Sequence, residues 1–182
     1  LSALSSQNFI TTTDNYNVAV GYYAGLNVTT GIQNTLIGGL AGDALTDADY
    51  NVAVGVQALS TDTLGSKSVA IGRSALSSQN FPSATDAHNV AVGYGAGNDV
   101  TTGTDNTFIG GLAGDANTTA SNNTALGYGA LGANISATNN TAIGRGALTA
   151  STGAKNTALG DLAGASVTTG SNLTLVGYNA QP

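Results

Sequence analysis

The sequence predicts an all-β fold, a β-solenoid of about ten coils with 17 residues each. A motif that reads Asn, β-branched residue, Ala or Leu, aliphatic residue, Gly recurs at nearly constant spacing. Gly, Ala, Thr and Asn are abundant in a 182-residue chain of which 41% is apolar and 8% charged. Apolar residues alternate within each motif and no 3.6-residue period is evident, so short strands and tight turns are favoured. Ten coils paired at ~4.8 Å would form a rod roughly 48 Å long.

The Gly that closes each motif gives the register of the repeat. Successive glycines lie 17 residues apart, except for one interval of 21 and one of 16. The segment SALSSQNF at 2–9 recurs at 74–81, which indicates a longer, 72-residue period. We interpret residues 1–182 as a single repeat array in which the block from Ser2 is repeated from Ser74, with two to three further coils and both ends in mid-array. The closing glycines are Gly21, Gly38, Gly55, Gly72, Gly93, Gly110, Gly127, Gly144, Gly160 and Gly177.

The residues within each strand form columns along the rod. The residue before the Gly is aliphatic in all ten copies, as is Val20, and the residue two places earlier is β-branched, as is Val18. These two columns share one face of the strand, and we predict that they line the core. The residue between them is Ala in seven copies, Leu in two and Phe in one, so the other face is apolar too. We predict that this second face, which contains Ala19, is buried against a partner chain.

Three more columns constrain the corners. Ala stands three residues after the Gly in every copy, as in Ala24, which indicates a position with little room. The Gly column indicates a positive φ or a close backbone approach. Asn opens eight of the ten motifs, Ser68 and Leu173 being the exceptions, and stacked Asn side chains are expected to form a ladder along the rod. A single copy buries too few aliphatic side chains to fold alone.

Composition excludes several classes of function. Four scattered cations and a net charge of −6 provide no basic stripe for nucleic acid or an anionic membrane. The longest apolar runs fall well short of the ~20 residues of a membrane helix, so we expect no membrane insertion. Because the chain has no Cys, no Glu and one His, His88, we expect no catalytic residues, no cofactor and no metal. The chain starts at Leu1 rather than Met, which we interpret as a fragment or processed product.

Three motifs that suggest chemistry have simpler structural interpretations. GGLAGD at 38–43 lacks the Lys and the helix of a phosphate loop, so a repeat corner is favoured. Asp43, Asp47 and Asp49 have the chemistry of a calcium site, but the second block keeps only one of these carboxylates, and a solvated turn is favoured. VTTG suggests the Thr array of an ice-binding face, but it occurs on three of ten coils.

Exposed aromatic residues are the weak candidates for ligand binding. Tyr22, Tyr94 and Tyr128 follow the closing Gly, where Arg73 and Arg145 stand in other copies. Outside a rod, such side chains contact sugars, or they cover neighbouring coils or a partner chain, which is the favoured interpretation.

Two long corners, 5–16 and 77–88, are each four residues longer than their neighbours. We predict that they protrude from a similar side of the rod and carry any side-on recognition. Phe9 and Phe81 occupy equivalent places in them. We expect both rings to pack back over the coil, although both are also weak binding candidates.

The motifs resemble those of known fibrous proteins. NTAIGRGAL at 140–148, NTALGYGAL at 123–131 and the segment 89–110 are similar to the 17-residue NTAIGYQAL-type repeats of bacteriophage tail fibres and tailspikes. SVAIGRSAL at 68–76 also resembles the head repeats of trimeric autotransporter adhesins, which form a left-handed β-roll. The 17-residue spacing favours the phage group. The resemblance covers essentially the whole chain and implies a homotrimer, but it supplies no catalytic residue.

We therefore predict a structural and adhesive shaft, or a receptor-binding segment, of a phage tail fibre, located in the virion and extracellular. The expected partners are two further copies of the chain and a host cell-surface glycan or protein. The alternatives are a bacterial surface adhesin or an extracellular filament that associates head to tail. A glycan-active tailspike fragment and an ice-binding protein are less favoured.

Overall fold

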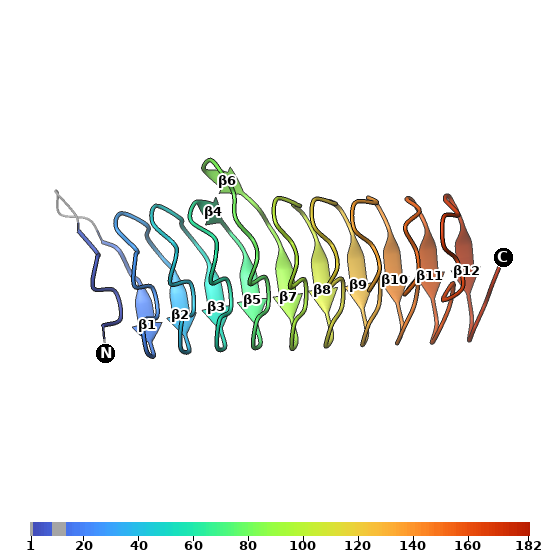
Figure 1. Ribbon diagram of the computed structural model, residues 1–182, viewed down its shortest axis with the longest axis horizontal. Helices are drawn as coiled ribbons and strands as arrows, with labels where there is room; N and C mark the ends of the chain where they lie inside the picture. Colours follow the sequence, from blue (N-terminus) through green and yellow to red (C-terminus); the bar gives the residue numbers. More distant parts are fainter. Residues whose placement is uncertain (1, 9–13) are drawn as a thin grey trace.

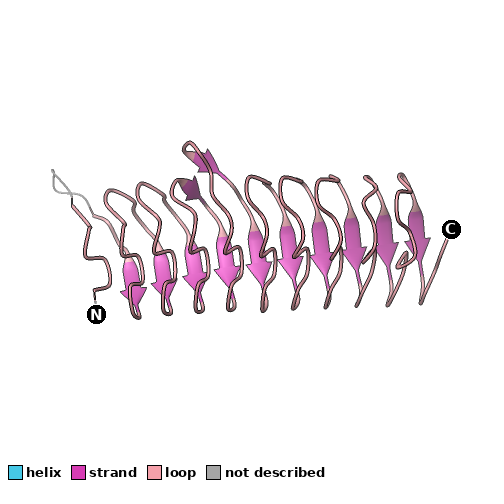
Figure 2. Cartoon of the chain, in the orientation of Figure 1, coloured by secondary structure: helices cyan, strands magenta, loops and turns pink. Residues whose placement is uncertain are grey.

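The computed structural model describes residues 2–8 and 14–182, and it confirms the β-solenoid. Over these residues the chain forms twelve strands and no helix. Ten strands stack in one sheet along the rod, and the termini lie at opposite ends (Figures 1 and 2). All neighbours in this sheet are parallel and pair motif to motif, so that Ala19 lies beside Leu36. The strands are β1 (Val18–Val20), β2 (Thr35–Ile37), β3 (Val52–Val54), β5 (Val69–Ile71), β7 (Val90–Val92), β8 (Thr107–Ile109), β9 (Thr124–Leu126), β10 (Thr141–Ile143), β11 (Thr157–Leu159) and β12 (Thr174–Val176).

The corner at 77–88 forms a second, small sheet. In it β4 (Gly65–Ser66) pairs in parallel with β6 (Thr85–Asp86). Figure 1 shows β6 standing out from the line of the other corners, as predicted for this segment. In the equivalent corner at 5–16, residues 9–13 lie outside the described residues.

The structure reverses the predicted inside and outside of the strands. The central residue of each strand points into the coil, and Ala53 and Phe108 are fully buried there. The flanking residues point outward, and Val18 and Val20 of β1 are 48% and 58% exposed. The prediction that the aliphatic column lines the core was therefore wrong, as was the prediction that the face containing Ala19 meets a partner. Alternation identifies residues that share a face, but it does not select the inner face when both faces are apolar. Small side chains fit the narrow coil, and this decides the orientation.

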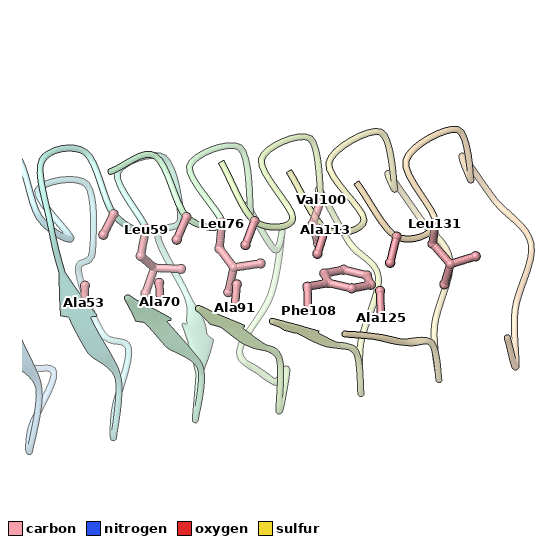
Figure 3. Packing of buried hydrophobic residues seen from close by; sticks show 14 of the residues in the cluster. Ala53, Leu59, Ala70, Leu76, Ala91, Val100, Phe108, Ala113, Ala125 and Leu131 are labelled. Atoms are coloured by element: carbon pink, nitrogen blue, oxygen red, sulfur yellow. The ribbon is translucent and has the colours of Figure 1, made fainter. Parts of the chain in front are cut away.

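The core is filled by residues of complementary size on two walls. In Figure 3 the strand residues point toward the corner that follows the closing Gly, where the column of invariant Ala is buried as predicted. Beside that Ala the chain has Gly where the strand residue is large: a Cβ at Gly114 would lie 2.5 Å from Cε1 of Phe108. Where the strand residue is small, as in Ala53 and Ala125, the same place holds a buried Leu, Leu59 or Leu131.

Close backbone approach explains the invariant Gly. Gly38 has φ +133°, and a Cβ on it would lie 2.5 Å from the carbonyl oxygen of Gly55 in the next coil. Both predicted reasons for Gly therefore apply.

The predicted Asn ladder is present and lies inside the coil. Asn34 is buried, and its Nδ2 donates to the carbonyl oxygen of Ala48 at 2.7 Å. Its Oδ1 accepts from the backbone N–H of Asn51 at 2.9 Å. Each such Asn therefore satisfies a corner carbonyl of its own coil and links that coil to the next.

Candidate functional site

The largest uniform surface is the outward side of the ten-stranded sheet, which we call the strand face. None of its side chains is charged, and none is buried. The two columns run the whole length of the sheet without interruption, since every strand contributes one β-branched and one aliphatic residue. The strand face consists of Val18, Val20, Thr35, Ile37, Val52, Val54, Val69, Ile71, Val90, Val92, Thr107, Ile109, Thr124, Leu126, Thr141, Ile143, Thr157, Leu159, Thr174 and Val176.

Ion pairs lie beside the strand face rather than on it. Lys67 and His88 belong to the column that precedes the Asn ladder, and Lys67 Nζ lies 2.5 Å from Asp86 Oδ2. His88 Nδ1 lies 3.6 Å from Asp105 Oδ1, so His88 is an exposed corner residue, as expected. On the other border, Arg145 and Asp161 pair at 2.9 Å. Apolar centre and charged borders are the usual anatomy of a protein interface.

The three Tyr candidates are exposed at one border of the strand face but have different surroundings. Tyr22 stacks on Tyr23, with ring centroids 3.9 Å apart. The guanidinium of Arg73 lies over the Tyr94 ring, with Cζ 5.7 Å from the centroid. The Tyr128 ring lies beside a glycine of the preceding coil. The three side chains belong to different coils and do not form one site.

Phe81 packs as predicted, because its ring is only 3% exposed. The backbone N–H of Phe81 donates to Oδ1 of the buried Asp62 at 3.3 Å. Such a ring is not available to a ligand on the surface. Phe9 lies outside the described residues.

A pocket of about 290 Å³ lies next to Tyr94, at the corner that follows the closing Gly. We call it the Tyr94 pocket. Three successive coils contribute to it, and sequence reasoning identified Tyr94 but not the cavity. Its lining consists of Arg73, Ser74, Tyr94, Gly95, Asn98, Asp99, Leu112 and Asp115.

Hydrogen bonds hold the polar lining of the Tyr94 pocket in place. Asn98 accepts from Ser77 Oγ at 2.8 Å and donates to Asp99 Oδ1 at 2.7 Å. The backbone N–H of Asp99 donates to the carbonyl oxygen of Asp115 at 3.0 Å. Burial raises the pKa of Asp115 above its ordinary value, and the nearby charge of Asp99 adds to the increase. The two carboxylates are therefore close enough to repel each other.

The aspartates considered for calcium have separate roles. Asp47 Oδ1 accepts from Thr30 Oγ1 at 2.5 Å, and Asp49 Oδ1 accepts from the backbone N–H of Ile32 at 2.8 Å. Burial raises the pKa of Asp43. Across residues 2–8 and 14–182, no three acidic, His or Cys side chains are placed to hold a metal ion together.

The Thr residues of the VTTG segments participate in coil-to-coil hydrogen bonds. Thr29 Oγ1 donates to the carbonyl oxygen of Thr46 at 3.2 Å, and Thr101 Oγ1 donates to that of Thr118 at 3.1 Å. These hydroxyls therefore stabilise the stack of corners. In the part of the chain that the structure describes, there is also no helix with the length and apolarity to span a bilayer.

Comparison of the chain with known protein families, with curated proteins and with solved structures found no match. The functional argument therefore relies on the strand face and the Tyr94 pocket.

Proposed function

We propose that this chain is a structural shaft segment of an extracellular fibre, of the kind found in phage tails, and that three copies associate through their strand faces. The observation that carries the proposal is the strand face itself, an uncharged surface that continues along all ten strands. Exposed apolar surface of this extent is typical of protein interfaces.

A second copy of the chain matches this surface better than an unrelated partner. Its strands have the same ~4.8 Å spacing, so a favourable contact at one coil repeats at every coil. The face is roughly 48 Å long and about 10 Å wide, or on the order of 500 Å² on each chain. Two such faces together approach the ~1,000 Å² of a specific interface.

A face only two residues wide suits three chains around a common axis. Each chain then directs its aliphatic column inward, and the charged borders remain in water. The resemblance of the repeats to those of phage fibres supports the same number of chains. In this role the rod sets the distance between a virion and a host cell-surface glycan or protein.

The test is the mass of the purified protein in solution. We expect three times the chain mass for the native sequence. Ile37→Lys combined with Ile109→Lys places charges on the strand face without disturbing the core, and should give monomers. Ile135→Lys is the matched control, because Ile135 is exposed in a corner and lies outside the strand face.

Other masses would contradict the proposal. A native monomer would rule out the trimer, and ice-growth inhibition by that monomer would assign the strand face to ice instead. A concentration-dependent series of longer species would favour the head-to-tail filament. A trimer that survives both Lys substitutions would place the interface elsewhere.

A further inference from the structure

The Tyr94 pocket exists because one corner lacks a side chain. The VTTG segments mark equivalent coils in the array, and the second residue after the closing Gly in these coils is Tyr23, Gly95 or Leu162. Tyr23 fills this place with a ring stacked on Tyr22. Gly95 leaves it open above Leu112, since a Cβ on Gly95 would lie 3.0 Å from Leu112 Cδ2. The cavity is therefore specific to one coil.

The charged groups of this pocket are not paired with one another. Within the described residues, Arg73 has no carboxylate oxygen within 4.0 Å, whereas the equivalent Arg145 pairs with Asp161. Arg73 Nη1 instead donates to the hydroxyl of Tyr94 at 3.4 Å. Asp99 and Asp115 supply only acceptors, and Arg73 supplies only donors. A complementary ligand must both donate and accept hydrogen bonds.

We propose that the Tyr94 pocket binds a single neutral sugar ring. Ring hydroxyls donate to the carboxylates of Asp99 and Asp115 and accept from the guanidinium of Arg73, while the apolar edge of the ring lies against Leu112 and Tyr94. The volume of about 290 Å³ is at the lower end for small-molecule sites, which suits one ring rather than a long chain. Two carboxylates facing one guanidinium disfavour an acidic sugar.

This inference rests on the proposed role in host attachment, and it adds the class of ligand. It is tested by saturation-transfer NMR with the methyl glycosides of glucose, galactose, mannose and N-acetylglucosamine as probes. We expect transfer from the protein to at least one of the four, and its loss in Gly95→Leu. Leu fits the backbone there, because Leu112 occupies the equivalent place in the next coil with φ +55° and Gly95 has φ +62°.

Gly129→Leu is the matched control. Gly129 occupies the same place two coils further on, with φ +63°, and a Cβ there would meet no atom within 4 Å. Transfer should be retained in this variant and weakened about tenfold or more in Asp115→Asn, which replaces a charged acceptor by a neutral amide. No transfer to any of the four glycosides, or equal transfer in Gly95→Leu, would overturn the proposal. The mass of the same samples tests the trimer separately, so the two failures are distinguishable.

Discussion

Gln79 Nε2 donates a 2.6 Å hydrogen bond to Asp62 Oδ2, and both side chains are fully buried. This pair lies where the Asn ladder is interrupted by Ser68. Gln79 also donates to Ser68 Oγ at 3.2 Å, and its Oε1 accepts from Asn89 Nδ2 at 2.9 Å. One Gln therefore bridges the gap that the shorter Ser leaves, at the coil that carries the long corner.

Asp62→Ala should destabilise the protein strongly. Asp62 accepts from Gln79 and from the backbone N–H groups of Gly65, at 3.0 Å, and Phe81. Removing the carboxylate leaves these donors buried without an acceptor, at about 1–3 kcal/mol for each unsatisfied group. Urea unfolding should show a clear decrease in the free energy of unfolding. Asp47→Ala, at an exposed corner, is the control, and an equal loss in both variants would contradict this role of Asp62.

The complementary core predicts that a size exchange restores stability. Phe108→Ala should cost about 3–5 kcal/mol through the cavity that it creates. Adding Gly114→Leu to it should recover part of this loss, because Ala125 and Leu131 form the same combination one coil further on. Leu131 has φ +55° and Gly114 has φ +58°, so the backbone accepts the change. Gly114→Leu alone should destabilise, since Phe108 occupies the space, and additive effects in the double variant would contradict the prediction.

The sequence predicted the coil, the register, the Asn ladder and the burial of Phe81, because each depends on a column that recurs every 17 residues. It did not predict which strand face is inside, because Val20 and Ala19 belong to columns that are both apolar. The Tyr94 pocket also escaped prediction. It depends on Gly95, a departure from its equivalents in other coils, and on side chains from three stacked coils whose proximity only the structure reveals.

The stacked glycines predict a contrast between two identical substitutions. Gly55→Ala places a Cβ 2.6 Å from the carbonyl carbon of Gly72, at φ +138°. Backbone of both coils must shift, and we expect a loss of roughly 3 kcal/mol or more. Gly177→Ala has φ +124° but would meet no atom within 4 Å, so it should cost only the backbone strain, about 1–3 kcal/mol. Thermal unfolding of the two variants measures the difference, and a larger effect at Gly177 would contradict the stacking argument.

Asp43 predicts a stability that decreases as the pH rises through the acidic range. Burial raises the pKa of Asp43 above 3.8, and one of its carboxylate oxygens is buried without a partner. Between pH 3.8 and the raised value, the folded state binds more protons than the unfolded state, so the free energy of unfolding falls as the pH increases. Below this window the contribution is fully present, and above it the loss is complete.

Asp43→Asn removes this dependence, and Asn98 occupies the same column one coil before Asp115. The variant should therefore be more stable than the native protein at pH 7 and should approach it near pH 3. Urea unfolding of both proteins across this range isolates the contribution of Asp43, because all other titrating groups cancel in the difference. A variant that is less stable at pH 7 would show that the Asp43 carboxylate is favoured in its charged form, by a contact that outweighs its burial.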